Sequence, residues 1–253
     1  MRYTLPAELH CHSNTKEIGF RLLPYLQDSL QTVEEIVLTC QKRGVKILAI
    51  TDHDSLLGYH MAKHFIETNK IKMLLIPACE VTTKKGHILA YGITKEIPRK
   101  LSARETIKLI HAQNGLAVAA HPFTFPFALG KKVFNLPIDA VEGFNGPTPS
   151  FLNFHSHSLA MKHHLPSIAG SDSHEPESLC YGITRFSSSV KTVEDFLQAL
   201  KVGNFSIEFT PTNNLSSALN HLKVLLTNIL TNTRPNTQPI PLHVSNQENS
   251  LNH

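Results

Sequence analysis

The chain has 253 residues, 41% of them hydrophobic, which is enough to form the core of one α/β domain. Its net charge of +4 is mild and its basic residues are dispersed, so we expect no binding surface for duplex DNA. The sequence has no apolar run of about 18 residues that could span a membrane and no basic-then-apolar signal pattern at its start, which together predict a cytoplasmic protein.

Strand-like and helix-like segments alternate through the first half of the chain. A capping box between Thr32 and Glu35 predicts the start of an amphipathic helix, and Gly44 predicts its end. Short apolar runs bounded by turn residues predict buried strands. The expected elements are strands at about residues 5–11, 45–51 and 73–77, helices at 32–44 and 58–69, and a hairpin at 81–92 with His87 near its turn.

The second half repeats this pattern. We expect helices at about 102–114, 150–164 and 192–202, strands at 116–120, 138–144, 167–170 and 205–209, and a last helix at 215–230. The composition after residue 230 is rich in Asn, Thr, Pro and Ser and has little periodicity. We therefore predict one domain over residues 1–210, a C-terminal helix packed on it over 211–230, and a disordered tail over 231–253.

Residues with metal-ligand chemistry follow several of the predicted strands. His10 and His12 alternate along the first strand, so both imidazoles point to the same side. Four later segments place His, Asp or Glu after short apolar runs: Thr51-Asp52-His53-Asp54, Ala78-Cys79-Glu80, Ala120-His121-Pro122 and Gly170-Ser171-Asp172-Ser173-His174. A mixture of imidazole and carboxylate ligands suits Zn, Mn or Fe, whereas Ca prefers oxygen ligands alone.

The alternation of elements favours a mostly parallel sheet with crossover helices. Ligands at the carboxyl ends of several strands converge only if the sheet closes or nearly closes. We therefore predict an α/β fold with a barrel that carries a metal site at the carboxyl ends of its strands. A doubly wound open sheet is the alternative, but it would struggle to bring five strand ends to one point.

The order and spacing of these motifs resemble the polymerase and histidinol phosphatase (PHP) family of metal-dependent phosphoesterases, over about residues 5–186. The resemblance implies a distorted seven-stranded (β/α) barrel and two or three divalent metal ions (Zn, Mn or Fe). Matched residue by residue, it implies nine metal ligands: His10, His12, Glu17, His53, Glu80, His87, His121, Asp172 and His174. Glu80 matches the carboxylate that typically bridges two metals in the family. Glu17 has different neighbours from the Ser-Asp-Gly usual in the family, so a third metal depends on whether Glu17 reaches the site.

Two further residues are candidates for catalytic roles. Asp52, beside His53, is expected to orient a ligand imidazole through a hydrogen bond. Arg185, after the last motif, is expected to neutralise phosphate oxygens. Glu142 and Asn145 resemble a Glu-x-x-Asn stretch of stand-alone family members, and the sequence alone assigns them no role.

The resemblance implies hydrolysis of a phosphomonoester or phosphodiester by a metal-activated hydroxide. The expected partner is a small phosphorylated substrate, with a nucleotide or short oligonucleotide favoured because an acidic third ligand is typical of that stand-alone type. The aromatic segment at residues 123–127 could stack on a base, although a core-packing loop is the simpler interpretation. The alternatives are a histidinol-phosphate phosphatase, a non-catalytic metal-binding PHP module, and an amidohydrolase acting on a C–N bond, which Glu80 in place of a carboxylated lysine disfavours.

Overall fold

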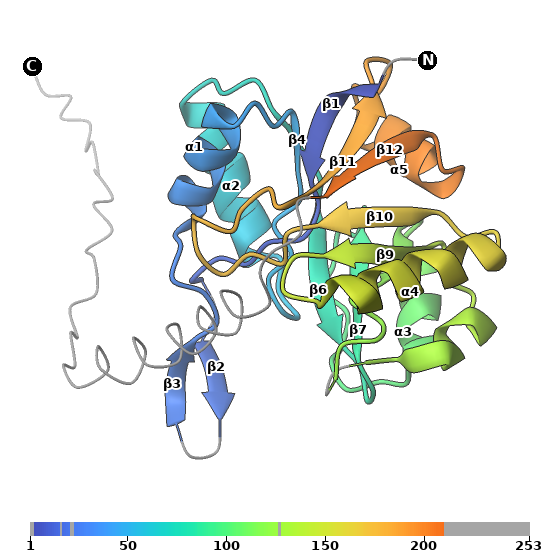
Figure 1. Cartoon of the computed structure of the whole chain (residues 1–253). Helices are drawn as coiled ribbons and strands as arrows, with labels where there is room; N and C mark the ends of the chain where they lie inside the picture. Colours follow the sequence, from blue (N-terminus) through green and yellow to red (C-terminus); the bar gives the residue numbers. More distant parts are fainter. Residues whose placement is uncertain (1–2, 16, 21–22, 126–127, 210–253) are drawn as a thin grey trace, which may run out of the picture.

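Two five-stranded sheets form the body of the protein (Figure 1). A computed structural model describes residues 3–15, 17–20, 23–125 and 128–209, and all their side chains except those of 17–20 and 23–27. The first sheet has the spatial order β12 (Phe205–Phe209), β11 (Gly182–Ser187), β1 (Tyr3–Glu8), β4 (Ile47–Leu48), β5 (Leu74–Leu75). The second has the order β10 (Ser167–Gly170), β9 (Ala140–Asn145), β8 (Leu116–Ala119), β7 (His87–Tyr91), β6 (Ala78–Thr82). A separate hairpin of β2 (Glu17–Phe20) and β3 (Leu23–Gln27) projects from the body.

Alternating side chains bury both faces of the second sheet. Leu89 of β7 and Val118 of β8 point toward the first sheet and join the central core, while Ile88 and Ala119 point to the opposite face. Successive residues of a strand face opposite sides, so such runs are apolar throughout when both faces are covered. This is why the strand sequences lack polar alternation.

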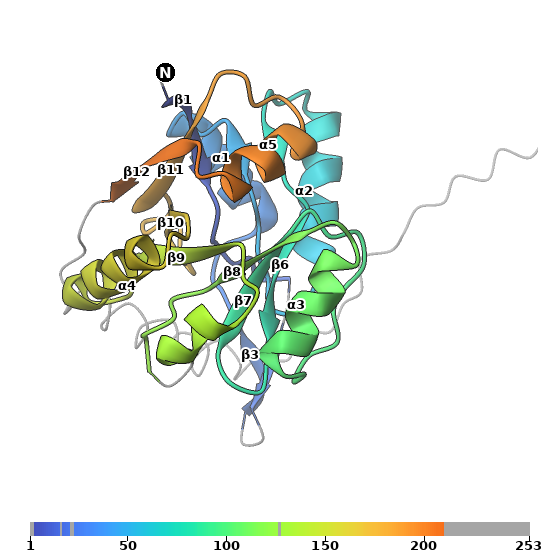
Figure 2. The same ribbon diagram turned by 90° about the vertical axis from the view of Figure 1, so that its right-hand side faces the viewer.

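The helices lie against both sheets (Figure 2). The helix α3 (Ala103–His111) and the helix α4 (Ser150–Lys162) pack on the outer face of the second sheet, and α1 (Val33–Lys42) packs with α2 (Leu57–Thr68) beside the first. The helix α5 (Val193–Lys201) contributes Phe196 to the central core, where its ring meets those of Tyr91 and Phe186. A short 3-10 helix spans Gly130–Asn135. Capping boxes open α1, α3 and α5, and the box of α1, between Thr32 and Glu35, is where the sequence predicted it.

The predicted seven-stranded barrel is not found as a closed barrel in the part of the chain that the structure describes. Ladder pairing runs within each sheet, and among the described residues strand pairing between the sheets occurs only at two isolated parallel bridges, Cys11 with Ser173 and His53 with Glu80. The prediction of a mostly parallel sheet was also wrong, because β1–β11–β12 and β6–β7–β8 are antiparallel. The turn at residues 83–86 is too short for the crossover that parallel strands require.

Most of the other predicted elements are confirmed, including the hairpin that carries His87. No helix among the described residues has the length and apolar character needed to cross a bilayer. The predicted helix at 211–230 and tail at 231–253 lie outside the described residues.

Candidate metal centre

The site begins where the inward-facing rows of apolar side chains end. On β6, Ala78 belongs to the central core and Glu80, two residues later, points the same way. On β9, Ala140 is followed two residues later by Glu142 on the same face. On β7, His87 lies on the same face as Leu89, two residues before it. Since β7 runs antiparallel to β6, its first residue lies at the same edge as the last residues of β6. One edge of the two sheets is therefore lined with ionisable groups.

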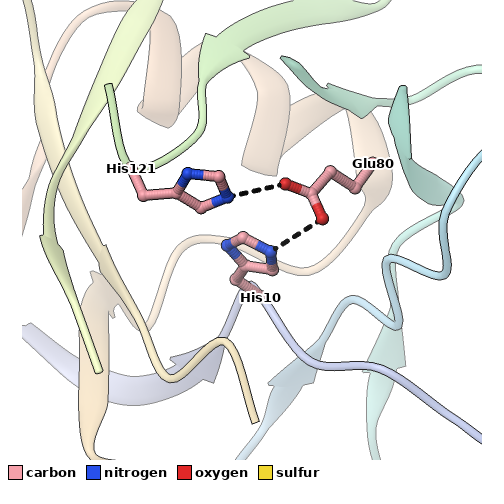
Figure 3. A group of neighbouring side chains, drawn as sticks. All are labelled: His10, Glu80 and His121. Atoms are coloured by element: carbon pink, nitrogen blue, oxygen red, sulfur yellow. Dashed lines mark hydrogen bonds and ion pairs between the residues drawn. The ribbon is translucent and has the colours of Figure 1, made fainter. Parts of the chain in front are cut away.

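Glu80 stands at the centre of this cluster. Its Oε1 lies 3.0 Å from His121 Nε2 and 3.0 Å from His87 Nδ1. Its Oε2 lies 3.4 Å from His10 Nε2, so that His10 and His121 contact different oxygens of one carboxylate (Figure 3). The same Oε2 is 3.3 Å from His12 Nε2 and 3.3 Å from His53 Nδ1. A carboxylate whose two oxygens each face imidazole nitrogens has the arrangement of a ligand that bridges two ions.

Asp172 closes a second group with the two histidines that follow β1. Its Oδ1 lies 3.3 Å from His10 Nε2 and 3.1 Å from His12 Nε2. Gly170 allows this close approach, because a Cβ added there would lie 2.6 Å from the Cβ of His10 and 2.7 Å from Glu142 Oε1. The end of β10 can therefore lie directly against the end of β1.

Asp28, just after β3, forms a third group that sequence reasoning missed. Its Oδ2 is 3.4 Å from His12 Nδ1 and 3.9 Å from His53 Nε2, and its Oδ1 is 3.5 Å from His174 Nε2. Asp28 is buried. Asp28 thus brings a carboxylate to this group, and the predicted ligand Glu17 has its side chain outside the described part of the structure.

The chemistry of the donors fits divalent transition-metal ions. Four groups of three ligand atoms have all atoms within 4.8 Å of one another: His10-Glu80-His121, His10-His12-Asp172, His12-Asp28-His53 and His53-Glu80-His87. Ions bound at about 2.0–2.2 Å would space neighbouring ligand atoms by about 3.0–3.6 Å, the range of most of these contacts. His10 Nε2, His12 Nδ1 and Asp28 Oδ2 are buried without a hydrogen-bond partner among the described residues. Buried polar atoms rarely stay unsatisfied, so these are the atoms that bound ions would satisfy.

Glu142 and Asn145 hold the ligands in place. The Nδ1–H of His10 donates to Glu142 Oε1 over 2.8 Å, and the backbone N–H of His121 donates to Oε2 over 2.8 Å. The Asn145 amide donates to Glu142 Oε2 and to Asp172 Oδ2, each over 3.1 Å. A carboxylate only accepts hydrogen bonds, so one hydrogen of His10 resides on Nδ1, and Nε2 is the atom that would present its lone pair to a bound ion once its own proton has left. The sequence held the signal in Val141-Glu142-Gly143-Phe144-Asn145, but its meaning depends on which strands are neighbours.

The charges of the cluster reinforce one another. Burial alone would lower the pKa of His10 and of His12, but the carboxylates of Glu142, Asp172, Glu80 and Asp28 outweigh burial and raise both pKa values well above normal. Burial opposes ionisation of Glu80, and the surrounding histidines, His87 and His53 foremost, nevertheless hold its pKa well below normal. For His53 burial prevails and lowers its pKa to about 4. The metal-free cluster therefore combines ionised carboxylates with imidazoles in both charge states.

Backbone strain coincides with the site. His121 has φ +24° and Asp172 φ +47°, both in the left-handed region that side chains other than glycine seldom adopt. Such conformations persist where surrounding contacts enforce them, and they cluster at functional sites. Here the contacts of Glu142 with His121 and of Asn145 with Asp172 provide that enforcement.

The two predicted catalytic residues lie at the margin of the cluster or away from it. Asp52 accepts hydrogen bonds from Ser13 N at 2.6 Å, Ser13 Oγ at 2.7 Å and Thr15 Oγ1 at 2.9 Å, so it anchors the backbone after His12 rather than an imidazole. Arg185 donates from Nε to Glu208 Oε2 over 2.6 Å in a partly exposed pair on β11 and β12. Its register partner is Pro6, four residues before His10 and about 13 Å along the strand. In this structure both side chains therefore form hydrogen bonds with protein groups outside the cluster.

One side of the cluster is open to solvent. The side chains of His10 and His12 are fully buried, whereas those of His53, His174 and Asp172 are 19%, 18% and 13% exposed. Among the described members of the cluster, these three side chains are the most exposed, so this side is the most open to solvent.

Two sequence comparisons find proteins similar to this chain. The profile of a family described as PHP-associated matches residues 152–205. The uncharacterized protein MJ1587 of Methanocaldococcus jannaschii is 34% identical over 147 residues, which are 56% of this chain and 82% of that protein.

Solved structures share the fold. A two-domain protein from Bacteroides vulgatus containing a predicted PHP-like metal-dependent phosphoesterase superposes with a TM-score of 0.64 at 16% identity over 81% of this chain. The lesion-specific endonuclease PfuEndoQ from Pyrococcus furiosus superposes with a TM-score of 0.58 at 22% identity over 80% of this chain. The chain spans 64% and 57% of the length of these two proteins.

Proposed function

This chain belongs to the PHP family, and we propose that it hydrolyses phosphate esters with the help of two or three divalent metal ions. The observation that carries the proposal is the bridging position of Glu80, whose two oxygens face five histidines from both sheets. Divalent ions bound on either side of such a carboxylate would lower the pKa of a coordinated water toward 7 and clamp the attacking and leaving oxygens of a phosphoryl group. Zinc, manganese or iron fits the mixed imidazole and carboxylate donors.

The residues divide this work among themselves. Glu80 would set the separation of the ions, with His10 and His121 on one side and His53 and His87 on the other. Asp28, Glu80 and Asp172 bring three negative charges, so a site loaded with two or more divalent ions is net positive and attracts a phosphate group. Glu142 and Asn145 keep His10 and Asp172 oriented while the substrate binds and leaves.

A nucleotide or short oligonucleotide is the substrate class we favour. The resemblance connects an acidic third ligand with nucleotide-cleaving stand-alone members, and Asp28 offers a carboxylate in the third group. Hydrolysis of histidinol phosphate is the alternative.

The test is metal content together with hydrolysis. We expect two or three ions per chain by elemental analysis after purification with Mn or Zn, and hydrolysis of 4-nitrophenyl phosphate or bis(4-nitrophenyl) phosphate by the loaded protein. The double variant His10→Ala, His12→Ala should lose both properties. The matched control is His60→Ala, His64→Ala, which removes two exposed histidines of α2 and should change neither. Bound metal without hydrolysis of any phosphoester would favour a metal-binding module, and absence of metal after loading would refute the proposed site.

A further inference from the structure

A cavity adjoins the metal cluster on the side of His87. It has a volume of about 480 Å³, within the range of small-molecule sites. Its lining consists of the β6–β7 turn, with His87 at one end, and two residues of the loop that follows His121: Thr82, Thr83, Lys84, Lys85, Gly86, His87, Phe125 and Ala128. Both walls thus continue directly from residues of the cluster.

The turn forms a rigid wall. Thr83 Oγ1 donates to Gly86 O over 2.7 Å and accepts from Lys85 N over 3.2 Å. Two backbone bonds fasten the turn to the segment before α3, from Lys84 N to Leu101 O at 2.8 Å and from Lys100 N to Thr82 O at 2.6 Å. The exposed side chains of Lys84 and Lys85 form no salt bridge within the described part of the chain. They give this wall a positive charge that suits a phosphorylated molecule.

Among the described residues of the opposite wall, the exposed aromatic ring is that of Phe125. Phe123 turns away and packs against His155, with ring centroids 4.8 Å apart. Phe125 is 89% exposed, an unusual state for a large apolar side chain. The loop itself is held by Thr124 N to His121 O at 3.0 Å and by a hydrogen bond of 2.6 Å between the hydroxyls of Thr124 and Thr148. An exposed ring on an anchored loop, beside a cavity, is a surface on which another planar ring can stack.

We propose that this cavity binds the leaving group of the phosphoester and selects substrates whose leaving group carries an aromatic ring, which stacks on Phe125. The inference rests on the proposed phosphoesterase function, because the cavity reaches the reacting phosphorus only through the cluster at His87. Lys84 and Lys85 attract the anionic substrate to the mouth of the cavity. This assigns substrate choice to the β6–β7 turn that precedes His87 and to the loop that follows His121.

The first measurement is equilibrium binding, by calorimetry, of phenylphosphonate and methylphosphonate to the metal-loaded protein. Neither compound has an ester bond to hydrolyse. Phe125→Ala should weaken the binding of phenylphosphonate about fivefold or more, the lower end of aromatic stacking effects, and leave methylphosphonate unchanged. Phe125→Tyr should restore the affinity. The matched control is Phe151→Ala, which removes a ring that is 70% exposed on α4 and should leave both affinities unchanged.

The second measurement is hydrolysis of phenyl phosphate and methyl phosphate by the same variants. Because each variant is compared with wild type on the same substrate, the intrinsic reactivity of the two esters cancels. We expect Phe125→Ala to raise KM for phenyl phosphate with kcat little changed. Equal effects on both esters, or on neither, with unchanged phosphonate binding would overturn the cavity proposal and leave the phosphoesterase function intact. If wild type hydrolyses neither these two esters nor the two nitrophenyl esters, the proposed function fails, and the phosphonate comparison still decides whether the cavity binds aromatic rings.

Discussion

Replacing Glu142 by Gln tests whether a residue that touches no ion controls the metal site. The carboxylate serves three donors, His10 Nδ1–H, His121 N–H and the Asn145 amide, over 2.8, 2.8 and 3.1 Å. A glutamine has one oxygen and one NH2 group, so it cannot accept from all three. Shape and volume are nearly unchanged, which limits the effect to hydrogen bonding.

Both orientations of the new amide are unfavourable. If its oxygen faces His10, its NH2 group meets the donors of His121 and Asn145, and two buried hydrogen bonds are lost. If its NH2 group faces His10, the imidazole must accept at Nδ1 and carry its hydrogen on Nε2, the atom that faces Glu80 and Asp172. That hydrogen occupies the position of an ion. We expect metal affinity to fall about 10–100-fold, or about 1.4–2.7 kcal/mol.

The assay is competition for Zn between the protein and a chromophoric chelator at constant pH. Thermal unfolding of the metal-free variant measures any separate loss of stability. Glu67→Gln, an exposed substitution on α2, is the matched control and should bind like wild type. A Glu142→Gln variant that binds Zn within twofold of wild type would refute the assignment of the His10 tautomer and the role of Glu142.

Three further predictions follow from the site and its surroundings. Asp28→Asn should lower the bound metal by about one ion per chain in elemental analysis while the other ions remain, and an unchanged content would place the third ion elsewhere. Because carboxylates raise the pKa of His10 and His12 well above normal despite burial, the metal-free protein carries protons there at neutral pH, and metal binding must release them. Metal affinity should therefore fall as pH falls, and calorimetry in buffers of different ionisation enthalpy should reveal the proton release; identical heats in all buffers would contradict it. Tyr91→Phe removes the buried hydrogen bond from the Tyr91 hydroxyl to Leu9 O, 2.8 Å long, and should lower the free energy of unfolding by about 1 kcal/mol in urea titration. Coincident unfolding curves would show that the bond adds nothing to stability.

Local sequence predicted which side chains gather at one edge of the sheets, because strand alternation and strand ends are short-range properties. His10 and His12, Glu80 and Asp172 each follow an apolar run, and the structure brings them together. The hairpin at β6–β7 was equally readable from the turn around Gly86, whose φ of +76° suits glycine.

Long-range arrangement was less predictable. Asp28 follows a segment with no helical or strand periodicity, and Glu17 was predicted because it matches in position the family's carboxylate that follows the second histidine. The role of Glu142 depends on β9 lying next to β8, whose end delivers His121, and no local pattern specifies that neighbour. The closed barrel was predicted from convergence of the ligands, but convergence requires only that the strand ends meet, and two bridges accomplish that.

Those bridges give the ions a mechanical role. The first sheet ends in His10, His12 and His53, and the second supplies Glu80, His87, His121 and Asp172, so every one of the four ligand groups except His12-Asp28-His53 draws atoms from both sheets. Each ion bound between them would be a cross-link over a seam that, among the described residues, strand pairing spans at only two places. A ligand that binds the folded state alone stabilises it by RT ln(1 + [L]/Kd), about 4 kcal/mol at a thousandfold excess over Kd. We therefore expect a chelator to lower the free energy of unfolding of the metal-loaded protein by loosening the joint between the two sheets.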